Sequence, residues 1–390
     1  MANWILMIKH NIETICLHHG AVEDSVHKGV ISPIYMSTAY QFNDVKEKRY
    51  PRYINTPNQE GLCKKIAAIE RGERALVFGS GMAAISTSLL SHLNSGDHVI
   101  FYNDIYGGTR NLIKKEFSNY NISYSFAAGS SVDDFKECIQ ENTKGIYIES
   151  PSNPLLKIVD MKAISDMAKS CKLWTMIDNT FASPINQNPI AFGIDIVIHS
   201  ATKYLGGHSD ISAGAVIASK KHIDRIYESA KNLGGTISEF SAWLLERSIK
   251  TLPIRVREQN KNALELAVFL ENHSQVYKVY YPGLVSHQDH EIAKKQMSGY
   301  GGMLSIEISS KIDPGLFFKN LKIIKPVMSL AGVESTANYP KSTSHFSLTD
   351  KERDHQGISD HLIRLSAGIE SIEDLKNDID NALKTSLYES

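Results

Sequence analysis

One lysine, Lys203, follows an apolar run and lies among small residues in "VIHSATKYLGGHSD". The preceding "FGIDIVI" has the β-branched composition of a buried strand, whereas "YLGGH" favours neither a strand nor a helix. Lys203 is therefore expected at the end of a sheet strand, where ligands bind in α/β folds. A lysine amine there can form a Schiff base with an aldehyde. The alternative is a loop-edge lysine with its ammonium in water.

An acid, Asp178, lies at the end of the apolar run "LWTMIDN". An isolated buried carboxylate is very unfavourable, so it needs a cationic partner such as Lys203 or a protonated ring nitrogen. The alternative is that the Asp178 side chain caps the turn that follows it.

A glycine-rich turn in "VFGSGMAAI" places Gly79, Ser80 and Gly81 between a predicted strand and a predicted helix. Free backbone N–H groups at a helix start bind phosphate or another anion. The same letters satisfy the dinucleotide fingerprint G-x-G-x-x-A, and Asp104 follows roughly where a ribose-binding acid belongs. The remaining interpretation is tight packing of a strand–helix turn.

An aromatic residue, Tyr106, precedes a glycine pair in "NDIYGGTR". A ring over open backbone suits stacking on a flat ligand, although a core tyrosine beside a turn is the alternative. The histidines His18, His287 and His290 have no third ligand at a recognised spacing, so we expect surface histidines and no metal.

Four of these features fall at junctions between strands and helices, so one crevice can hold them. They are an anion site at Ser80, a stacking ring at Tyr106, a buried acid at Asp178 and the amine of Lys203. A flat, phosphorylated pyridine that carries an aldehyde accounts for all four. NAD accounts only for the glycine turn and Asp104.

The elements that must position these residues alternate along the chain. Short apolar runs at 74–78, 98–102, 145–150, 173–179 and 195–201 are separated by helical patterns such as 82–93 and 161–171. Strand and helix in alternation predict an α/β fold with a largely parallel sheet that helices cover.

Beyond Leu252–Pro253 the pattern changes. A long helix over 257–273 is followed by predicted strands at 276–283 and 301–308 and a closing helix over 371–387. These patterns predict a smaller α+β domain. The expected parts are an N-terminal arm (1–57), a large domain (58–250) and a C-terminal domain (251–390).

The bulk composition describes an ordinary globular protein of 390 residues, 42% hydrophobic and 22% charged. A net charge of -1 gives no electrostatic case for nucleic acid or an anionic membrane. The N-terminal "MANWILMIKH" is too short an apolar run for a signal peptide or a membrane span. Four scattered cysteines without a CxxC pair indicate reduced thiols and a cytoplasmic protein.

The chain resembles the Cys/Met-metabolism family of pyridoxal-phosphate enzymes over almost its whole length, and "SATKYLGGHSD" is the most specific matching element. Other matching segments follow in the expected order: "RYPRYINTPN", "FGSGMAAI", "YGGT", "ESPSNP", "IDNTF", "YPGLVSHQDHEIAKKQ", "SLAGVES" and "LIRLSAGIE". The resemblance implies the fold-type-I, aspartate aminotransferase-like α/β fold with a mostly parallel central sheet, and pyridoxal 5'-phosphate as cofactor.

The resemblance also implies roles for single residues. Three would be catalytic: Lys203 would hold the cofactor and move protons, Asp178 would face the ring nitrogen, and Tyr106 would stack on the ring. The residues implied around the cofactor phosphate are Ser80, Gly81, Met82, Ser200 and Thr202, together with Tyr50 and Arg52 of a neighbouring subunit. Asn153 would lie towards the phenolic oxygen of the ring. The implied substrate-binding residues are Glu149, Ser329 and Arg364, with the planar guanidinium of Arg364 on the α-carboxylate.

The activity that the resemblance implies is β- or γ-elimination from cystathionine or a related sulfur amino acid. The alternative within the family is the cystathionine gamma-synthase reaction, in which cysteine replaces the leaving group of an O-activated homoserine. A NAD-binding dehydrogenase and a non-catalytic regulator remain as alternatives of other classes. Because Tyr50 and Arg52 would enter a neighbouring site, the resemblance implies a homotetramer built from catalytic dimers.

Some positions depart from the family pattern. Pro51 replaces the usual serine of Tyr-Ser-Arg, and Asn55 is followed by Thr56-Pro57 rather than Pro-Thr, which predicts a different loop around Arg52. Gly108 stands where methionine gamma-lyases often carry cysteine, which argues against that activity. Asn338 stands where cystathionine lyases often carry glutamate, which leaves open how the distal amino group is bound. The segment "GHSD" fits the lyase and synthase branch better than the sulfhydrylase branch.

Overall fold

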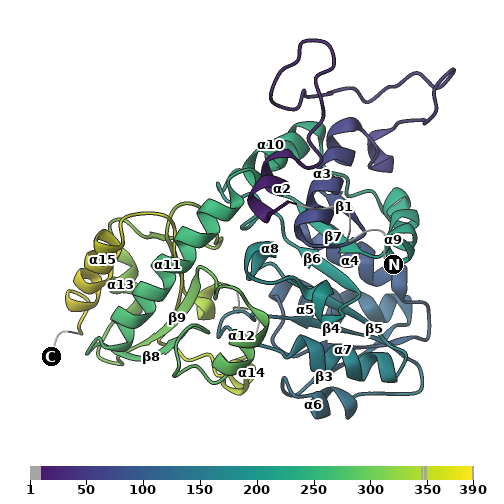
Figure 1. Ribbon diagram of the computed structural model, residues 1–390. Helices are drawn as coiled ribbons and strands as arrows, with labels where there is room; N and C mark the ends of the chain where they lie inside the picture. Colours follow the sequence, from purple (N-terminus) through teal and green to yellow (C-terminus); the bar gives the residue numbers. More distant parts are fainter. Residues whose placement is uncertain (1–9, 344–345, 347–348, 389–390) are drawn as a thin grey trace.

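The computed structural model describes residues 10–343, 346 and 349–388. The stretch "MANWILMIK", to which the expectation about signal peptides and membrane spans applies, lies outside the described residues. Figure 1 shows two sheets side by side, with the long helix α11 (Leu252–Glu271) running from one to the other.

The larger sheet has seven strands in the order β1-β7-β6-β5-β4-β2-β3. Its strands are β1 (Arg74–Phe78), β2 (His98–Tyr102), β3 (Ser123–Ala127), β4 (Thr143–Glu149), β5 (Trp174–Asp178), β6 (Ile196–His199) and β7 (Gly214–Ala218). Four adjacent pairs are parallel, and β7 is antiparallel to both of its neighbours. The predicted α/β fold with a mostly parallel sheet is confirmed.

Two strands of this sheet were not predicted from the sequence, and both have identifiable causes. β7 is "GAVIA", in which all five residues are buried but only Val216 and Ile217 are β-branched, so the strand signal is short. β3 is the edge strand "SYSFA", in which the first four residues remain partly or fully exposed. Its weak apolar pattern therefore reflects its position at the sheet edge.

Helices accompany this sheet, and several of them begin at side-chain caps. They are α3 (Pro57–Ile69), α4 (Gly81–His92), α5 (Gly107–Glu116), α6 (Val132–Lys136), α7 (Met161–Ser170), α8 (Ser183–Asn186), α9 (Lys220–Leu233) and α10 (Glu239–Ile249), with the 3₁₀ turns η2 (Phe117–Tyr120) and η3 (Pro189–Phe192). Thr56 and Gln59 form a capping box at the start of α3, and Pro57 takes the first helical position. The departure Thr56-Pro57 thus starts a helix.

The smaller sheet has the order β10-β11-β12-β9-β8, and all of its pairs except β10–β11 are antiparallel. Its strands are β8 (Val276–Tyr280), β9 (Met303–Ile308), β10 (Lys325–Pro326), β11 (Thr336–Asn338) and β12 (Leu362–Ser366). Around it lie α11, α12 (His290–Gln296), α13 (Pro314–Asn320), η4 (Pro340–Ser342), α14 (Asp350–Gln356) and α15 (Ile372–Lys384). Leu252 and Val256 at the start of α11 pack in the core of the larger sheet, and Leu266 and Leu270 pack in that of the smaller sheet. The boundary between residues 250 and 251 stays a prediction.

The N-terminal region contains one helix that the sequence interpretation missed, α2 (Ile12–His18). Ile15 and Cys16 are buried, and this short apolar contact holds the helix against the body of the protein. The following segment extends away from the body (Figure 1) and ends in the 3₁₀ turn η1 (Pro51–Tyr53). Pro51 takes the first position of this turn, and a difference of this loop from the family pattern stays a prediction.

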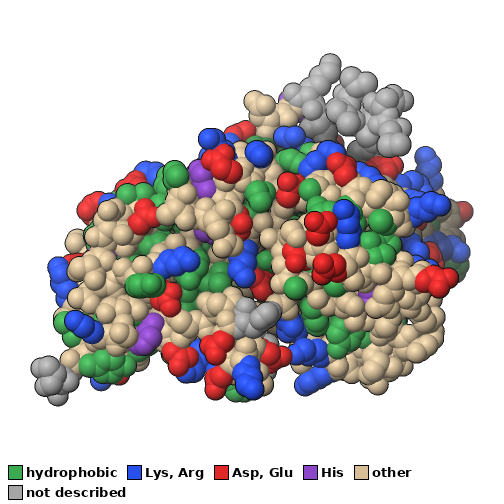
Figure 2. Space-filling view, turned by 90° about the horizontal axis from the view of Figure 1, so that it is seen from below, with side chains coloured by type: hydrophobic (Ala, Val, Ile, Leu, Met, Phe, Trp, Pro, Cys, Tyr) green, Lys and Arg blue, Asp and Glu red, His purple; other side chains and the backbone are tan. Residues whose placement is uncertain are grey.

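On the face seen in Figure 2, basic and acidic side chains are interspersed rather than gathered by sign. None of the helices in the described part of the chain is long and apolar enough to cross a membrane.

Candidate active site

The lysine that the sequence singled out lies in the turn directly after β6, so the expected strand-end position is confirmed. The Lys203 Nζ donates a hydrogen bond to Ser329 Oγ at 3.0 Å. Ser329 lies in the segment before β11, so this bond joins the larger sheet to the part of the chain around the smaller one. Burial and the nearby positive charge of Arg364 lower the pKa of Lys203 from 10.5 to about 8. A fraction of the amine is then neutral near neutral pH, as a base requires.

The lowered pKa predicts how the stability of the cofactor-free protein depends on pH. Below about pH 8 the folded chain carries the full penalty of burying the Lys203 ammonium, and between about 8 and 10.5 only the unfolded chain keeps that proton. Stability therefore rises with pH across this window. Lys203→Met should raise the free energy of unfolding by on the order of 1–3 kcal/mol near neutral pH. The difference in stability between the variant and the wild type should shrink towards pH 10. Chemical denaturation of both cofactor-free proteins at the two pH values measures this, and a constant difference would contradict it.

Two carboxylates end adjacent strands. Asp178 is the last residue of β5 and Glu149 the last of β4, and they are direct partners in the parallel register. Burial raises the pKa of both, and the charge of Asp178 raises that of Glu149 further. Asp178 Oδ1 accepts a hydrogen bond from Thr180 N at 3.0 Å, so Asp178 does cap the following turn. A carboxylate has two oxygens and can accept this bond while it pairs with a cation, so the two interpretations of Asp178 are compatible.

The glycine turn lies against the residues ahead of Lys203. A Cβ placed on Gly81 would come within 2.8 Å of Ser200 Cβ, so only glycine permits this approach. Ser80 caps α4, because its Oγ accepts from Ala83 N at 3.1 Å. The amides of Gly81 and Met82 occupy the first two helical positions, which have no partner within a helix and suit an anion.

The predicted stacking ring borders the same turn. Glu149 Oε2 accepts a hydrogen bond from Tyr106 N at 2.7 Å, which fixes Tyr106 at the start of α5. A Cβ on Gly108 would lie 2.5 Å from Tyr106 Cε1 and 3.1 Å from Met82 Sδ. Glycine at 108 therefore leaves room for the Tyr106 ring, which is 46% exposed and can stack on a ligand.

The smaller sheet contributes Arg364, in β12. Its Nη1 donates to Asn153 Oδ1 at 3.0 Å, while Nη2 is buried without a hydrogen-bond partner among the described residues. Burial lowers the pKa of Arg364 to about 10, so it remains charged at neutral pH. A buried guanidinium with an unpaired N–H group is a binding site for a carboxylate.

The remaining predicted site residues differ in their contacts with the residues described above. Thr202 Oγ1 donates to Ala213 O at 3.2 Å, which anchors the lysine turn, and its role at a phosphate stays a prediction. Tyr50 directly precedes η1, and Arg52 lies within it. The Arg52 guanidinium donates to Lys231 O and lies over the ring of Tyr53. Arg52 thus contacts α9 of its own chain, and the Tyr50 ring packs against the ring of Tyr53.

Sequence reasoning missed Arg255, which holds the lysine turn. It lies in α11, and its Nη1 donates to Tyr204 O at 2.9 Å while Nη2 donates to Ser248 O at 3.0 Å. A Cβ on Gly207, whose φ is +67°, would collide with Arg255 Nη1. An arginine in a charged helical pattern gave no signal that it would be buried.

The dehydrogenase alternative is wrong. In a dinucleotide-binding sheet the strand before the glycine turn and the strand before the ribose-binding acid are neighbours. Here β7, β6, β5 and β4 lie between β1 and β2. Asp104 is instead paired with Lys157 Nζ at 2.8 Å.

The residues that meet here fit pyridoxal phosphate. The start of α4 suits the phosphate, Asp178 suits a protonated ring nitrogen, and the half-buried amine of Lys203 suits the aldehyde. The unpaired Nη2 of Arg364 suits the carboxylate of an amino acid bound beside the cofactor.

Comparisons with known proteins agree with this fit. Residues 13–384 match the family model described as Cys/Met metabolism PLP-dependent enzyme. The chain is 44% identical over 378 residues to cystathionine beta-lyase of Lactococcus lactis subsp. cremoris, covering 96% of this chain and 99% of that one. It is 40% identical to cystathionine gamma-lyase of Bacillus subtilis, covering 95% and 99%.

Among solved structures, cystathionine gamma-lyase from Lactobacillus plantarum complexed with L-serine superposes with a TM-score of 0.93 at 35% identity. The match covers 97% of this chain and 99% of that chain. A family match over nearly the whole length, with relatives above 40% identity and the same fold, leaves one conclusion. The chain belongs to the family of Cys/Met metabolism enzymes that depend on pyridoxal phosphate.

Proposed function

We propose that this protein cleaves a carbon–sulfur bond at the β or γ carbon of cystathionine or a related sulfur amino acid. The relatives support this substrate class, since both beta- and gamma-lyases of cystathionine are among them. The observation that carries the proposal is the meeting of Lys203, Ser329 and Arg364, which places a proton-transfer group beside a carboxylate site.

In the proposed reaction the substrate α-carboxylate binds Arg364, whose Nη2 gains the partner that it lacks. Asn153 holds the guanidinium through Nη1, so the clamp is oriented before substrate arrives. This clamp directs the α hydrogen towards Lys203, whose neutral amine removes it. When bound, pyridoxal phosphate supplies an electron-accepting ring that stabilises negative charge at the α carbon.

The other candidate residues support this step. The Asp178 carboxylate would keep a proton on the ring nitrogen of the bound cofactor, and Tyr106 would stack on its ring. The proton held at Lys203 Nζ can be returned to the departing sulfur or to carbon. Gly81, Met82, Ser200 and Thr202 would hold the phosphate, and Glu149 fixes the Tyr106 turn by accepting a hydrogen bond from the Tyr106 N–H.

A panel assay tests the proposed function. The purified protein, loaded with pyridoxal phosphate, is given cystathionine, cysteine, methionine and O-acyl homoserines, and keto acid and thiol are followed. Release of keto acid with homocysteine identifies β-elimination, and release of keto acid with cysteine identifies γ-elimination. Formation of cystathionine from an O-acyl homoserine and cysteine would establish the gamma-synthase alternative, which stays open until then.

We also propose a homotetramer of catalytic dimers in the cytoplasm. The extended arm carries exposed apolar side chains, among them Val26, Val30 and Phe42, at 77%, 98% and 73% exposure, which a neighbouring subunit would cover. Arg52 is exposed on the same arm and can reach a phosphate in a partner. The cytoplasmic location rests on the four cysteines, all of which are free.

Mixed oligomers test the shared site. Subunits with Lys203→Ala and subunits with Arg52→Ala are each expected to be nearly inactive. Refolded together, they should recover about a quarter of wild-type activity, because half of randomly formed dimers are hybrids with one intact site of two. Activity that stays at the level of the separate variants, while both fold, would contradict the shared site.

A further inference from the structure

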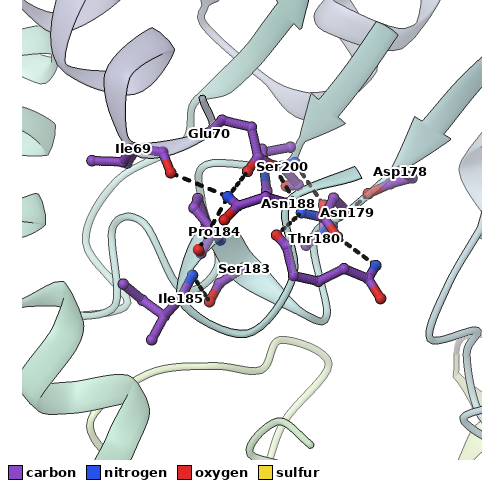
Figure 3. A network of polar contacts seen from close by, with 12 residues as sticks. Ile69, Glu70, Asp178, Asn179, Thr180, Ser183, Pro184, Ile185, Asn188 and Ser200 are labelled. Atoms are coloured by element: carbon purple, nitrogen blue, oxygen red, sulfur yellow. Dashed lines mark hydrogen bonds and ion pairs between the residues drawn. The ribbon is translucent and has the colours of Figure 1, made fainter. Parts of the chain in front are cut away.

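A buried carboxylate outside the site, Glu70, connects the strand ends that carry it. Glu70 follows the last residue of α3 and is fully buried. Asn179 Nδ2 and His199 Nε2 lie 2.7 and 2.8 Å from its Oε1, and Asn188 Nδ2 lies 2.8 Å from its Oε2 (Figure 3). A carboxylate at the C-terminal end of a helix is electrostatically unfavourable, so these three donors offset both the burial and the helix dipole.

The orientation of these donors is fixed by their other bonds. Asn179 Nδ2 also donates to Gln187 O, and Asn188 Nδ2 also donates to Pro184 O. Turning either amide over would place its oxygen against a carboxylate or a carbonyl. Both amides therefore donate to the carboxyl oxygens of Glu70.

The residues that Glu70 holds are chain neighbours of the site. Asn179 directly follows Asp178, and His199 directly precedes Ser200. The two strand ends are also joined by Asn179 N to Ile198 O at 2.9 Å. Burial raises the pKa of Asp178, whereas hydrogen bonds from Thr180 and the attraction of His199 counteract that rise. His199, which contacts Glu70, is thus also one of the groups that influence the pKa of Asp178.

The network extends to the next strand. Gln187 Nε2 donates to Asn179 Oδ1 at 2.9 Å and to Ser150 O at 3.0 Å. Ser150 directly follows Glu149, the last residue of β4. One connected set of hydrogen bonds therefore holds the ends of β4, β5 and β6.

We propose that Glu70 is a positioning residue for the reaction, because it sets the separation between Asp178 and the turn from Ser200 to Lys203. These two groups are assigned to opposite ends of a rigid, planar cofactor, which cannot adapt to a change in their spacing. The inference rests on the proposed function for its catalytic consequence. A displacement of about 1 Å in such a site lowers the rate by on the order of 10²-fold.

The test compares Glu70→Gln with a matched buried variant, Glu246→Gln. In Glu70→Gln one carboxylate oxygen becomes an NH₂ group. If that group replaces Oε2 it faces the amide N–H of Asn188, and if it replaces Oε1 it faces Asn179 and His199. Glu246 is also buried and pairs with Lys65 of α3 at 3.2 Å, away from the strand ends. Both variants remove one buried carboxylate next to the same helix.

Glu70→Gln is expected to weaken pyridoxal-phosphate binding about 10-fold and to change the visible circular dichroism of the bound cofactor. It should lower kcat for cystathionine on the order of 10²-fold with little change in KM, because Arg364 is untouched. Glu246→Gln should lower the melting temperature while it leaves the dichroism, the cofactor affinity and kcat at wild-type values.

Equal effects of the two variants on affinity, dichroism and kcat would overturn the inference, and so would wild-type behaviour of Glu70→Gln. If Glu70→Gln does not fold, His199→Asn replaces it, since this change removes only the contact to β6. A wild-type dichroism and kcat in His199→Asn would then overturn the inference. Absence of lyase turnover in the wild-type protein, with the dichroism contrast intact, would reject the proposed function alone.

Discussion

Replacing Lys203 by alanine is expected to lower kcat/KM for elimination by at least about 10²–10⁴-fold, the range that general acid–base catalysis contributes. The structure gives the reason. A free lysine titrates near 10.4 and would be almost fully protonated at neutral pH. Burial and the charge of Arg364 bring the pKa of Lys203 to about 8, so the neutral amine is available.

The measurement that isolates this role is exchange of the substrate α hydrogen with deuterium, followed by NMR in heavy water. Lys203→Ala should still bind pyridoxal phosphate without a covalent bond, yet the exchange should stop. Lys278→Ala, which removes an exposed lysine of β8 that lies over the Tyr280 ring, is the control and should exchange normally. Near wild-type exchange in Lys203→Ala would show that another group is the base.

Replacing Arg364 by lysine should raise KM for the amino-acid substrate on the order of 10²-fold or more, since removing one partner of a buried, hydrogen-bonded charge pair costs about 2–5 kcal/mol. Lysine cannot offer two parallel N–H groups, so the contact to Asn153 and the contact to the carboxylate cannot both be kept. The effect should fall mainly on KM, because the amine of Lys203 remains in place.

The comparison that assigns this effect to the carboxylate uses the substrate and its α-amide. The wild-type protein should bind the acid far more tightly than the amide, and Arg364→Lys should bind the two more nearly alike. Arg247→Lys, at an exposed position of α10, serves as the control. A variant that keeps the full preference for the acid would rule out Arg364 as the carboxylate site.

Individual residues show how far the sequence could be interpreted. The strand-end positions of Lys203 and Asp178 were predictable because each is a lone charged residue that follows an apolar run. Such an apolar run forms a buried strand, so the charged residue lies at or just beyond the end of that strand. The same argument found the turn after β1. In contrast, α2 was missed because its seven residues contain only two buried side chains, too few to show a helical period.

Pattern reasoning from single segments also left the cofactor class open. The glycine turn and Asp104 satisfied a dinucleotide fingerprint as well as they satisfied a phosphate site. The order of the strands decided between them, because four strands separate β1 from β2. Strand order depends on contacts between distant segments, which no local pattern records.

The sequence by itself therefore determined the alternation of strands and helices, the strand-end positions of Asp178 and Lys203, and the family resemblance that implied the rest. Only the tertiary structure decided which distant groups meet: Ser329 with Lys203, Asn153 with Arg364, and Glu70 with the residues beside Asp178 and Ser200. The physical reason is that burial and charge pairing depend on neighbours from other elements. The unpaired Nη2 of Arg364 and the lowered pKa of Lys203 exist only once the two sheets have packed together.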